Sequence, residues 1–420
     1  MELTTKQGFK QTEVGLIPED WEVFMIEDVS SVVGGGTPST KVSSYWNGSI
    51  EWFTPTEISN VKYSYSSVRK ITKEGLNNSS AQILPKGAIL MTTRASIGDL
   101  SILQNEACTN QGFQSLIAKD IISNEYLYYL MLTNRVNLLR NASGSTFLEI
   151  SPKKIKSIKI PLPPTLKEQK AIATALSDVD DLIVSLEGLI AKKQAIKQGA
   201  MQQLLIPPHK GGKRLPGFSG EWVEKELGEL GQFKNGVNKG AEDFGHGKPF
   251  INLLDVFGIP SISSGKSLGL INSTPEERKI YDLKKGDVLF VRSSVKPSGV
   301  GLTTVIIDDL INSVFSGFLI RFRDNNTLNL TFKIHCFHSK EFRDKVISSS
   351  SSSANTNINQ EALSSLTIWY PPTDSEQKAI AKILSDMDTE LEQLETKKAK
   401  YQQLKQGMLQ ELLTGNTRLV

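Results

Sequence analysis

Cysteine, long apolar runs and excess charge are all scarce in this 420-residue chain. Its two cysteines, Cys108 and Cys336, lie too far apart for a disulfide framework, which predicts a reducing, cytoplasmic location. No run of 18 or more apolar residues predicts a membrane span, and the first residues show no basic-then-apolar signal pattern. With 48 Lys and Arg against 45 Asp and Glu, the charge only weakly favours a polyanionic partner.

Complete catalytic motifs are also missing. Gly265-Lys266-Ser267 imitates a phosphate-binding P-loop, but Pro260 stands where its first glycine is required. His335, Cys336 and His338 have no second cluster in the sequence to complete a tetrahedral zinc site. We therefore expect a non-catalytic protein without a metal or cofactor.

A stretch of sequence that occurs twice determines how this chain is organised. Residues 163–173 and 371–381 share Pro-Pro-Thr followed by Glu-Gln-Lys-Ala-Ile-Ala, 208 positions apart. The alignment continues without a gap to a Lys-Gln-Gly at 197–199 and 405–407. So long a period indicates a duplicated domain plus helix rather than a solenoid, whose units are far shorter.

Each copy predicts a long helix. Thr165 and Thr373 are expected N-caps, and Glu168 and Glu376 follow three residues later, as a capping box requires. Apolar residues then recur at alternating steps of three and four, which predicts a coiled-coil seam. About 40 residues at 1.5 Å each give a rod of roughly 60 Å, whose nearest partner is its own copy. The expected pairing residues are Ile172, Leu176, Val179, Ile183, Leu186, Ile380, Leu384, Met387, Leu391 and Leu394.

A globular region precedes each helix. Short β-branched runs such as 89–93 and 113–117 alternate with turn residues and predict strands, and 126–139 has helical spacing, so we expect mixed α/β domains. The second region restates landmarks of the first: Lys285-Gly286 matches Lys86-Gly87, and Gly317-Phe318 matches Gly112-Phe113. The expected boundaries are 1–164 for the first domain, 165–206 for the first helix, 207–372 for the second domain, 373–414 for the second helix and 415–420 for a tail.

The order domain, helix, domain, helix resembles the specificity subunit of type I restriction-modification systems. Besides the repeated helix motif, residues 35–41 (Gly-Gly-Thr-Pro-Ser-Thr-Lys), 52–58 and 109–113 resemble that family's target-recognition domain. The second domain departs from the pattern, because Asn235-Gly236-Val237-Asn238-Lys239-Gly240 stands where Gly-Thr-Pro is expected.

The resemblance implies an α+β fold with an internal pseudo-two-fold repeat and two helices packed as an antiparallel coiled coil. It also implies that each domain reads one half of a split, asymmetric DNA site. The helices would set the gap and dock two methylation subunits, while restriction and translocation would belong to a further subunit. The alternative is a non-catalytic coiled-coil scaffold whose domains bind protein instead of DNA.

Polar loop residues are the candidate DNA contacts. Arg and Lys read guanine, Asn and Gln read adenine, and Ser or Thr read either, although over half of such contacts go to phosphate and sugar. A serine run at 348–353, which matches 141–147, reads either as a flexible linker or as a DNA-facing loop. The candidates in the first domain are Thr37, Ser39, Thr40, Lys41, Thr92, Thr93, Arg94, Asn110 and Gln111. Those in the second are Lys234, Asn235, Asn238, Lys239, Arg292, Ser293, Ser294 and Lys296.

Overall fold

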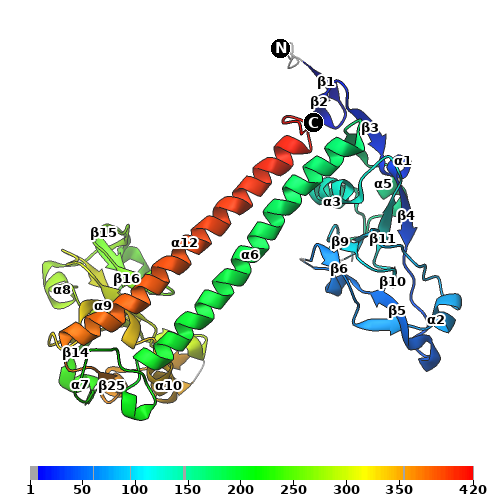
Figure 1. Ribbon diagram of the computed structural model, residues 1–420. Coiled ribbons are helices and arrows are strands. Elements are labelled where there is room, and N and C mark those ends of the chain that lie inside the picture. Colours follow the sequence, from blue (N-terminus) through cyan, green and yellow to red (C-terminus); the bar gives the residue numbers. More distant parts are fainter. Residues whose placement is uncertain (1–7, 60, 95, 145–147, 353–354, 420) are drawn as a thin grey trace. The chain divides into compact units, whose positions relative to one another are not determined.

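Each copy of the repeated motif opens one long helix, α6 (Leu166–Leu204) and α12 (Asp374–Leu412), in the computed structural model (Figure 1). The structure describes residues 8–59, 61–94, 96–144, 148–352 and 355–419. Two compact units result: unit 1 comprises Met1–Glu187 and Lys397–Val420, and unit 2 comprises Gly188–Thr396. Each unit therefore contains one mixed domain together with a part of both long helices. Within these described ranges, no helix combines the length and apolarity needed to cross a membrane.

Unit 1 contains a five-stranded sheet in the order β4-β11-β8-β9-β6 and a three-stranded sheet in the order β10-β5-β7. Two further pairs, β1-β2 and β3-β12, complete its strands. The strands are β1 (Phe9–Thr12), β2 (Gly15–Pro18), β3 (Glu22–Met25), β4 (Ser30–Gly34), β5 (Trp46–Phe53), β6 (Tyr63–Ser64), β7 (Arg69–Ile71), β8 (Ile89–Met91), β9 (Leu100–Leu103), β10 (Ala107–Thr109), β11 (Gln114–Ala118) and β12 (Lys159–Leu162). Its short helices are α1 (Ile26–Val29), α2 (Lys73–Asn77), α3 (Asn124–Thr133), α4 (Arg135–Asn141) and α5 (Pro152–Lys156).

Unit 2 repeats this plan, with sheets in the orders β14-β22-β18-β20-β16 and β17-β15-β21 and a β13-β25 pair. It adds a small β19-β24-β23 sheet. The strands are β13 (Val223–Glu226), β14 (Gly231–Asn235), β15 (Phe244–Ile251), β16 (Ser261–Ile262), β17 (Gly269–Ile271), β18 (Val288–Val291), β19 (Ser293–Ser294), β20 (Thr303–Ile306), β21 (Val314–Phe315), β22 (Leu319–Asp324), β23 (Ser351–Ser352), β24 (Thr356–Asn357) and β25 (Thr367–Tyr370). Its short helices are α7 (Leu227–Leu230), α8 (Pro275–Ile280), α9 (Leu330–Cys336), α10 (Lys340–Ser348) and α11 (Gln360–Ser364).

Strand register gives the residue correspondence between the two domains. Thr93 N donates to Gly112 O at 2.9 Å, and Arg292 N donates to Phe318 O at 2.8 Å in the same place of unit 2. Phe318 therefore corresponds to Gly112, and the sequence match of Gly317-Phe318 with Gly112-Phe113 is wrong by one residue. Strand alternation puts successive side chains on opposite faces. Because of this one-residue difference, the side chain of Phe318 faces outward, and 58% of its surface is exposed.

Two strand predictions and one helix prediction are confirmed with shifted ends. The runs 89–93 and 113–117 coincide closely with β8 and β11, which are neighbours inside the five-stranded sheet. The predicted helix 126–139 is divided into α3 and α4 at Asn134. The side chain of Asn134 donates to the carbonyl oxygen of Leu130 at 2.8 Å, which satisfies an acceptor at the end of α3.

The seam residues pack antiparallel in each unit. In unit 1, Ile172 and Leu176 near the start of α6 share a core with Leu409 and Leu412 at the end of α12. In unit 2 the roles are exchanged, because the end of α6 packs against the start of α12. The members there are Leu204, Leu205, Ile380 and Leu384. Of the other predicted pairing residues, Leu186 is buried, and Val179, Ile183, Met387, Leu391 and Leu394 are half-buried.

An ion pair repeats at the 208-residue offset. Lys405 contacts Asp180 at 2.5 Å in unit 1, and Lys197 contacts Asp388 in unit 2. Each pair joins α6 to α12, and the two pairs exchange the helix that supplies the lysine. Exposed pairs contribute little to stability. Their repetition nevertheless shows that the two helices meet in a pseudo-two-fold arrangement.

The glutamine of each Glu-Gln motif fastens its helix to the preceding domain. Gln169 Oε1 accepts from Ser123 N at 2.8 Å, and its Nε2 donates to Ile121 O at 3.1 Å and Pro163 O at 3.3 Å. Both glutamines are buried, so these bonds form away from water. Gln377 makes the matching bonds with Asn329 N, Thr327 O and Pro371 O.

The glutamate of each motif binds an arginine that follows the other long helix. Glu168 pairs with Arg418 (Nη2 to Oε2, 2.9 Å), and Glu376 pairs with Arg214 (2.6 Å). The exposed fractions of Glu168 and Glu376 are 1% and 0%. The expected capping box forms only by half: Glu168 N donates to Thr165 Oγ1 at 3.2 Å, while the Glu168 side chain faces Arg418.

Replacing either arginine by alanine leaves a buried carboxylate without its charge partner. We expect Arg214→Ala to destabilise unit 2, and Arg418→Ala to destabilise unit 1, by roughly 3–5 kcal/mol each. Amide hydrogen exchange measured in α10 reports the loss of stability of unit 2, and exchange measured in α3 reports that of unit 1. Adding Glu376→Gln to Arg214→Ala removes the stranded charge and should restore much of the stability, and Lys382→Ala serves as a surface control. Losses below about 0.5 kcal/mol, typical of surface substitutions, would contradict this role.

All four histidines of the chain lie in unit 2. His335 Nε2 lies 2.9 Å from Ser385 Oγ on α12, and Asp388 lies 3.8 Å from its Nδ1. Burial lowers the pKa of His335 to about 4, against the attraction of Asp388 and with the repulsion of Lys197. Burial, with Arg343 nearby, also lowers the pKa of His338 to about 4.

Acid should therefore destabilise unit 2 through these histidines. In the unfolded chain, both imidazole rings take up a proton as the pH falls through about 6.5. In the folded protein they stay neutral until the pH falls to about 4. The stabilisation is thus complete above pH 6.5 and is lost as the pH falls toward 4, by about 1–2 kcal/mol per histidine between pH 7 and 5. Hydrogen exchange in α10 at both pH values, corrected for intrinsic rates, measures the loss. A His335→Gln/His338→Gln variant should flatten the slope, and an unchanged slope would refute the assignment.

Candidate nucleic-acid interface

The three predicted loops of unit 1 meet beside the ends of β4, β8 and β10. Gly36 N donates to Thr109 O at 2.8 Å, and Thr93 N donates to Gly112 O at 2.9 Å. Across the loops, Thr37 Oγ1 donates to Gln111 Oε1 at 2.5 Å. Residues 35–41, 92–94 and 109–112 therefore form one surface, which we call loop cluster 1.

Glycine is required where these loops approach each other most closely. A Cβ atom on Gly35 would lie 1.9 Å from the carbonyl oxygen of Asn110, and one on Gly236 of unit 2 would lie 2.2 Å from that of Ser316. Contacts below 3.0 Å would force the backbone to move. The same backbone crossing is thus built into both domains, although the residues around it differ.

Loop cluster 1 divides into buried and accessible candidates. Thr92 and Thr93 are buried, and their hydroxyls donate to Ser96 O and Gly112 O, so neither side chain faces outward. Asn110 is half-buried and accepts from Gly112 N at 2.9 Å. The exposed candidates are Thr37, Ser39, Thr40, Lys41, Arg94 and Gln111.

Two basic residues of unit 1 are held in defined positions. Arg94 pairs with Glu149 at 2.8 Å while both side chains stay nearly half exposed. Arg69 lies with its guanidinium 3.7 Å from the ring centre of Trp46, whose Nε1 donates to Ser39 O at 3.1 Å. Arg69 was not among the sequence candidates, because nothing in the order of residues links position 69 to Ser39.

Unit 2 forms the corresponding loop cluster 2 from residues 234–240, 292–296 and 316–318. Gly317 N donates to Val237 O at 2.8 Å, and Arg292 Nη1 donates to Gly317 O at 3.4 Å. Asn238 is exposed, and Lys239 is held by Glu277 at 2.9 Å. Of the remaining candidates, Lys234, Asn235, Ser293 and Ser294 are half-buried and Lys296 is exposed.

The serine-rich segments lie next to these loops. In unit 2, β24 pairs with both β19 and β23, so Thr356 and Asn357 run beside Ser293 and Ser294. In unit 1, Glu149 forms isolated bridges with Arg94 and with Ser143. The described parts of both segments thus lie near the loop clusters, and the DNA-facing interpretation stays a prediction. Residues 145–147 and 353–354 of these segments lie outside the described residues.

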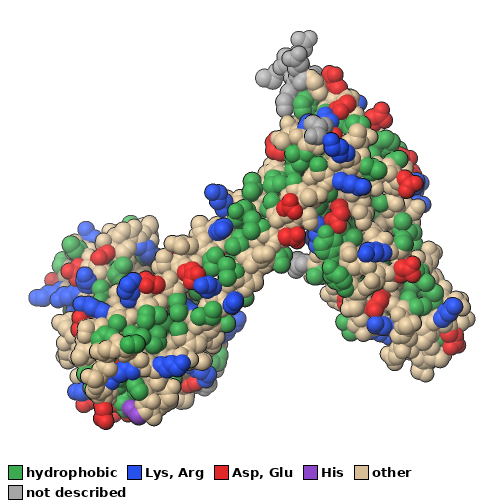
Figure 2. Space-filling view, viewed as in Figure 1, with side chains coloured by type: hydrophobic (Ala, Val, Ile, Leu, Met, Phe, Trp, Pro, Cys, Tyr) green, Lys and Arg blue, Asp and Glu red, His purple; other side chains and the backbone are tan. Residues whose placement is uncertain are grey.

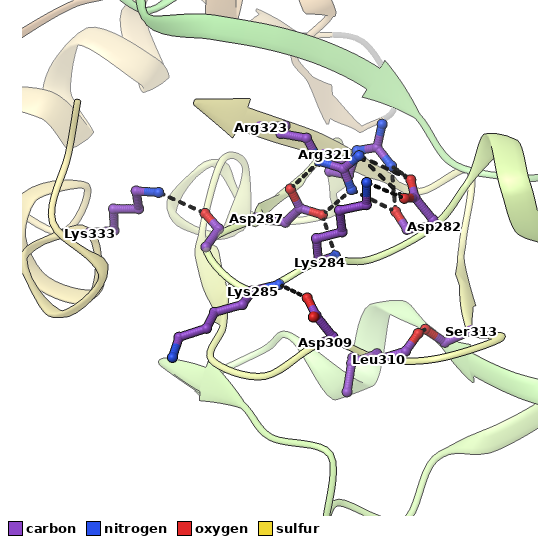
Figure 3. Close-up of polar contacts among 11 residues, drawn as sticks. Asp282, Lys284, Lys285, Asp287, Asp309, Leu310, Ser313, Arg321, Arg323 and Lys333 are labelled. Atoms are coloured by element: carbon purple, nitrogen blue, oxygen red, sulfur yellow. Dashed lines mark hydrogen bonds and ion pairs between the residues drawn. The ribbon is translucent and has the colours of Figure 1, made fainter. Parts of the chain in front are cut away.

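A charged network supports the five-stranded sheet of unit 2 (Figure 3). Arg323 Nη2 contacts Asp287 at 2.6 Å, and Arg321 Nη1 contacts Asp282 at 2.8 Å. Burial raises the pKa of Asp282, but the guanidinium groups of Arg323 and Arg321 outweigh it and hold that pKa below its usual value. Lys333 pairs with Asp324 and donates to Gly286 O at 2.9 Å on the same turn.

This network is structural, because every carboxylate in it faces a cation or a backbone amide. It fastens the turn 282–287, from which β18 leads to Arg292 and loop cluster 2. In the described part of the chain, no group of three or more His, Cys, Asp or Glu residues could hold a metal ion. Figure 2 shows Lys and Arg side chains interspersed with Asp and Glu over the face in view, so charge alone does not mark a binding surface on it.

Comparisons with known proteins agree on one family. The family model described as "Type I restriction modification DNA specificity domain" matches residues 18–198 and 219–406. The chain is similar to the MjaIX specificity subunit of Methanocaldococcus jannaschii, with 35% identity over 314 residues, 70% of this chain and 71% of that one. It is also similar to the EcoR124I/EcoR124II specificity subunit of Escherichia coli, with 32% identity over 190 residues, 43% of this chain and 45% of that one.

Solved structures support the fold. The S subunit of the type I restriction-modification system of M. genitalium matches with a TM-score of 0.55 and 16% identity, and 98% of each chain is covered. A structure described as showing complex assembly and conformational transition of the type I R-M system matches with a TM-score of 0.62 and 18% identity, over 96% of this chain and 99% of that one. Since the family model matches nearly the whole chain in two copies, this protein belongs to the family of type I restriction-modification DNA specificity domains.

Proposed function

We propose that this chain is the sequence-specific DNA-binding subunit of a type I restriction-modification complex, and that it has no catalytic role of its own. The observation that carries the proposal is the pair of loop clusters. They occupy the same place on two copies of one scaffold and carry different polar residues. Such an arrangement suits one asymmetric DNA site, whose two halves differ in base sequence and are each read by one of the loop clusters.

The exposed residues of the clusters are the proposed DNA contacts. In loop cluster 1 these are Thr37, Ser39, Thr40, Lys41, Arg94 and Gln111, to which we add Arg69. In loop cluster 2 they are Asn238 and Lys296, with Arg292, Ser293 and Ser294 partly accessible. Bidentate arginine favours guanine and the amide side chains favour adenine. Lys239 is tied to Glu277, which favours a supporting position.

The same proposal implies that each recognition domain can be exchanged for that of another specificity subunit. We take residues 1–164 and 207–372 as the two readers, 165–206 and 373–414 as the spacer helices of the two repeats, and 415–420 as a tail. One turn of DNA is about 34–36 Å, and about 40 residues at 1.5 Å each give a helix of roughly 60 Å, so each helix is longer than one turn of DNA.

We further propose that two methylation subunits dock on the helices, completing an adenine methyltransferase to which a restriction subunit can be added. The support is an apolar patch that occurs twice. Leu404, Gly407 and Met408 lie beside Leu419, and an open groove of about 700 Å³ runs along them. The patch at Ile196, Gly199 and Ala200 holds the matching positions of unit 2. Leu404 and Ile196 are 49% and 46% exposed.

The proposed setting is the cytoplasm, where the DNA lies and where the buried, free Cys108 and Cys336 stay reduced. The alternative function, a coiled-coil scaffold that binds only proteins, finds no support in the comparisons, since every relative named above is a specificity subunit. Measuring binding at several salt concentrations distinguishes the two functions, because the affinity of a protein for DNA falls steeply as the salt concentration rises.

Exchanging residues 1–164 for the first domain of another specificity subunit should change one half-site and leave the other half-site and the gap unaltered. Methylation mapping of a genome carrying the hybrid measures both. As a point test, Arg94→Ala should weaken binding by roughly 10-fold or relax one base preference. Lys73→Ala, an exposed change on α2, is the matched control. A hybrid that alters both half-sites would contradict independent readers.

Placing a charge in either apolar patch should remove one docking site. Leu404→Asp and Ile196→Asp should each lower the number of bound methylation subunits from two to one, and the double variant should bind none, because a buried unpaired carboxylate is costly. Native mass spectrometry counts the subunits. Lys382→Asp is the control for an exposed helix position. Retention of two subunits by both single variants would exclude these patches.

A further inference from the structure

An apolar hollow opens among the proposed DNA contacts of loop cluster 2. It measures about 490 Å³ and is lined by Leu253, Phe257, Val295, Leu302 and Phe318 together with Ser293, Ser294 and Lys296. Phe318 is 58% exposed and Val295 is 82% exposed. Large side chains left open in this way, beside polar groups, mark a binding surface.

Two differences from unit 1 form this hollow. Phe318 stands where unit 1 has Gly112, as the paired bonds from Arg292 N and Thr93 N establish. The connection from β18 to β20 is also longer. Gly301 N donates to Val291 O at 2.7 Å across residues 292–300, whereas Gly98 N donates to Thr92 O at 2.9 Å across residues 93–97 only. The additional residues include Val295 and Lys296, which form one wall.

The rim indicates the kind of ligand. Lys296 supplies positive charge, with Arg292 adjoining Ser293 in the chain, and Ser293 and Ser294 supply hydroxyl groups. The surroundings therefore suit phosphate and base edges rather than an apolar protein segment. On the edges of duplex DNA, the group that matches an apolar wall is the C5-methyl of thymine in the major groove. Phenylalanine and small apolar side chains are suited to contact that methyl group.

We propose that this hollow is a specificity site for the 5-methyl group of thymine, with Phe318 and Val295 as its contacts. The inference rests on the proposed function and deepens it: the half-site read by unit 2 contains at least one thymine recognised through its methyl group. Unit 1 has Gly112 in place of Phe318, so the proposal assigns no such contact to that position of its half-site.

The test uses the full chain and a duplex carrying its recognition sequence, selected from a random pool. Each thymine is replaced in turn by deoxyuridine, which removes the methyl group and keeps every hydrogen-bonding group. At one thymine of a single half-site, we expect affinity to fall roughly 3- to 10-fold, as for loss of one buried methyl group. Phe318→Ala and Val295→Ser should each bind the thymine and deoxyuridine duplexes nearly equally.

Ile311→Ala is the matched control, since Ile311 is 80% exposed in unit 2 and does not line the hollow. This variant should keep the full deoxyuridine penalty. Two outcomes would overturn the methyl site and leave the proposed function standing. One is sequence-specific binding in which deoxyuridine lowers the affinity at no thymine. The other is a half-site, affected by Phe318→Ala, that contains no thymine. A penalty that persists in Phe318→Ala overturns the methyl site as well. Failure to select any sequence overturns the proposed function itself.

Discussion

The structure depends on a reciprocal pairing: the repeated glutamate near the start of each long helix binds an arginine that follows the other long helix. Glu168 binds Arg418 and Glu376 binds Arg214, so neither repeat completes its own buried ion pair. The repeated Asp180–Lys405 and Asp388–Lys197 contacts obey the same exchange. Because buried charges need their partners, this pairing favours antiparallel helices over parallel ones and gives the fold its pseudo-two-fold character.

On this common frame, the two domains solve the same packing problem with different residues. The turn before β18 is fixed by Asp282, Asp287, Arg321 and Arg323, whereas unit 1 has uncharged residues such as Ala88 and Ser115 in the corresponding strands. The backbone crossing at Gly35 and Gly236 is kept, and the loops around it are free to differ. A subunit that reads two unlike half-sites needs this combination of constant frame and variable loops.

The sequence predicted the frame well because periodicity and motif identity are local signals. The long helices and their seam could be predicted from the spacing of Ile172 to Leu186 and of Ile380 to Leu394, and the mixed domains from the short runs 89–93 and 113–117. The sites were harder, because burial is decided by partners distant in sequence. Thr92 and Thr93 looked like loop residues but bond inward, and Phe318 aligned with the buried Phe113 until strand register moved it by one position. Glu168 obeyed a capping rule in sequence, yet its carboxylate turns to an arginine 250 residues away.

The longer connection 292–300 illustrates how such a protein acquires new preferences. Lengthening a surface loop costs little free energy, since closure entropy grows only slowly with length. Four additional positions therefore suffice to add a wall of side chains beside the loop cluster, while β18 beneath still pairs antiparallel with both β20 and β22. Under the function and the methyl site proposed above, a change of length at this connection would alter the residues facing DNA without touching the helices on which docking is proposed.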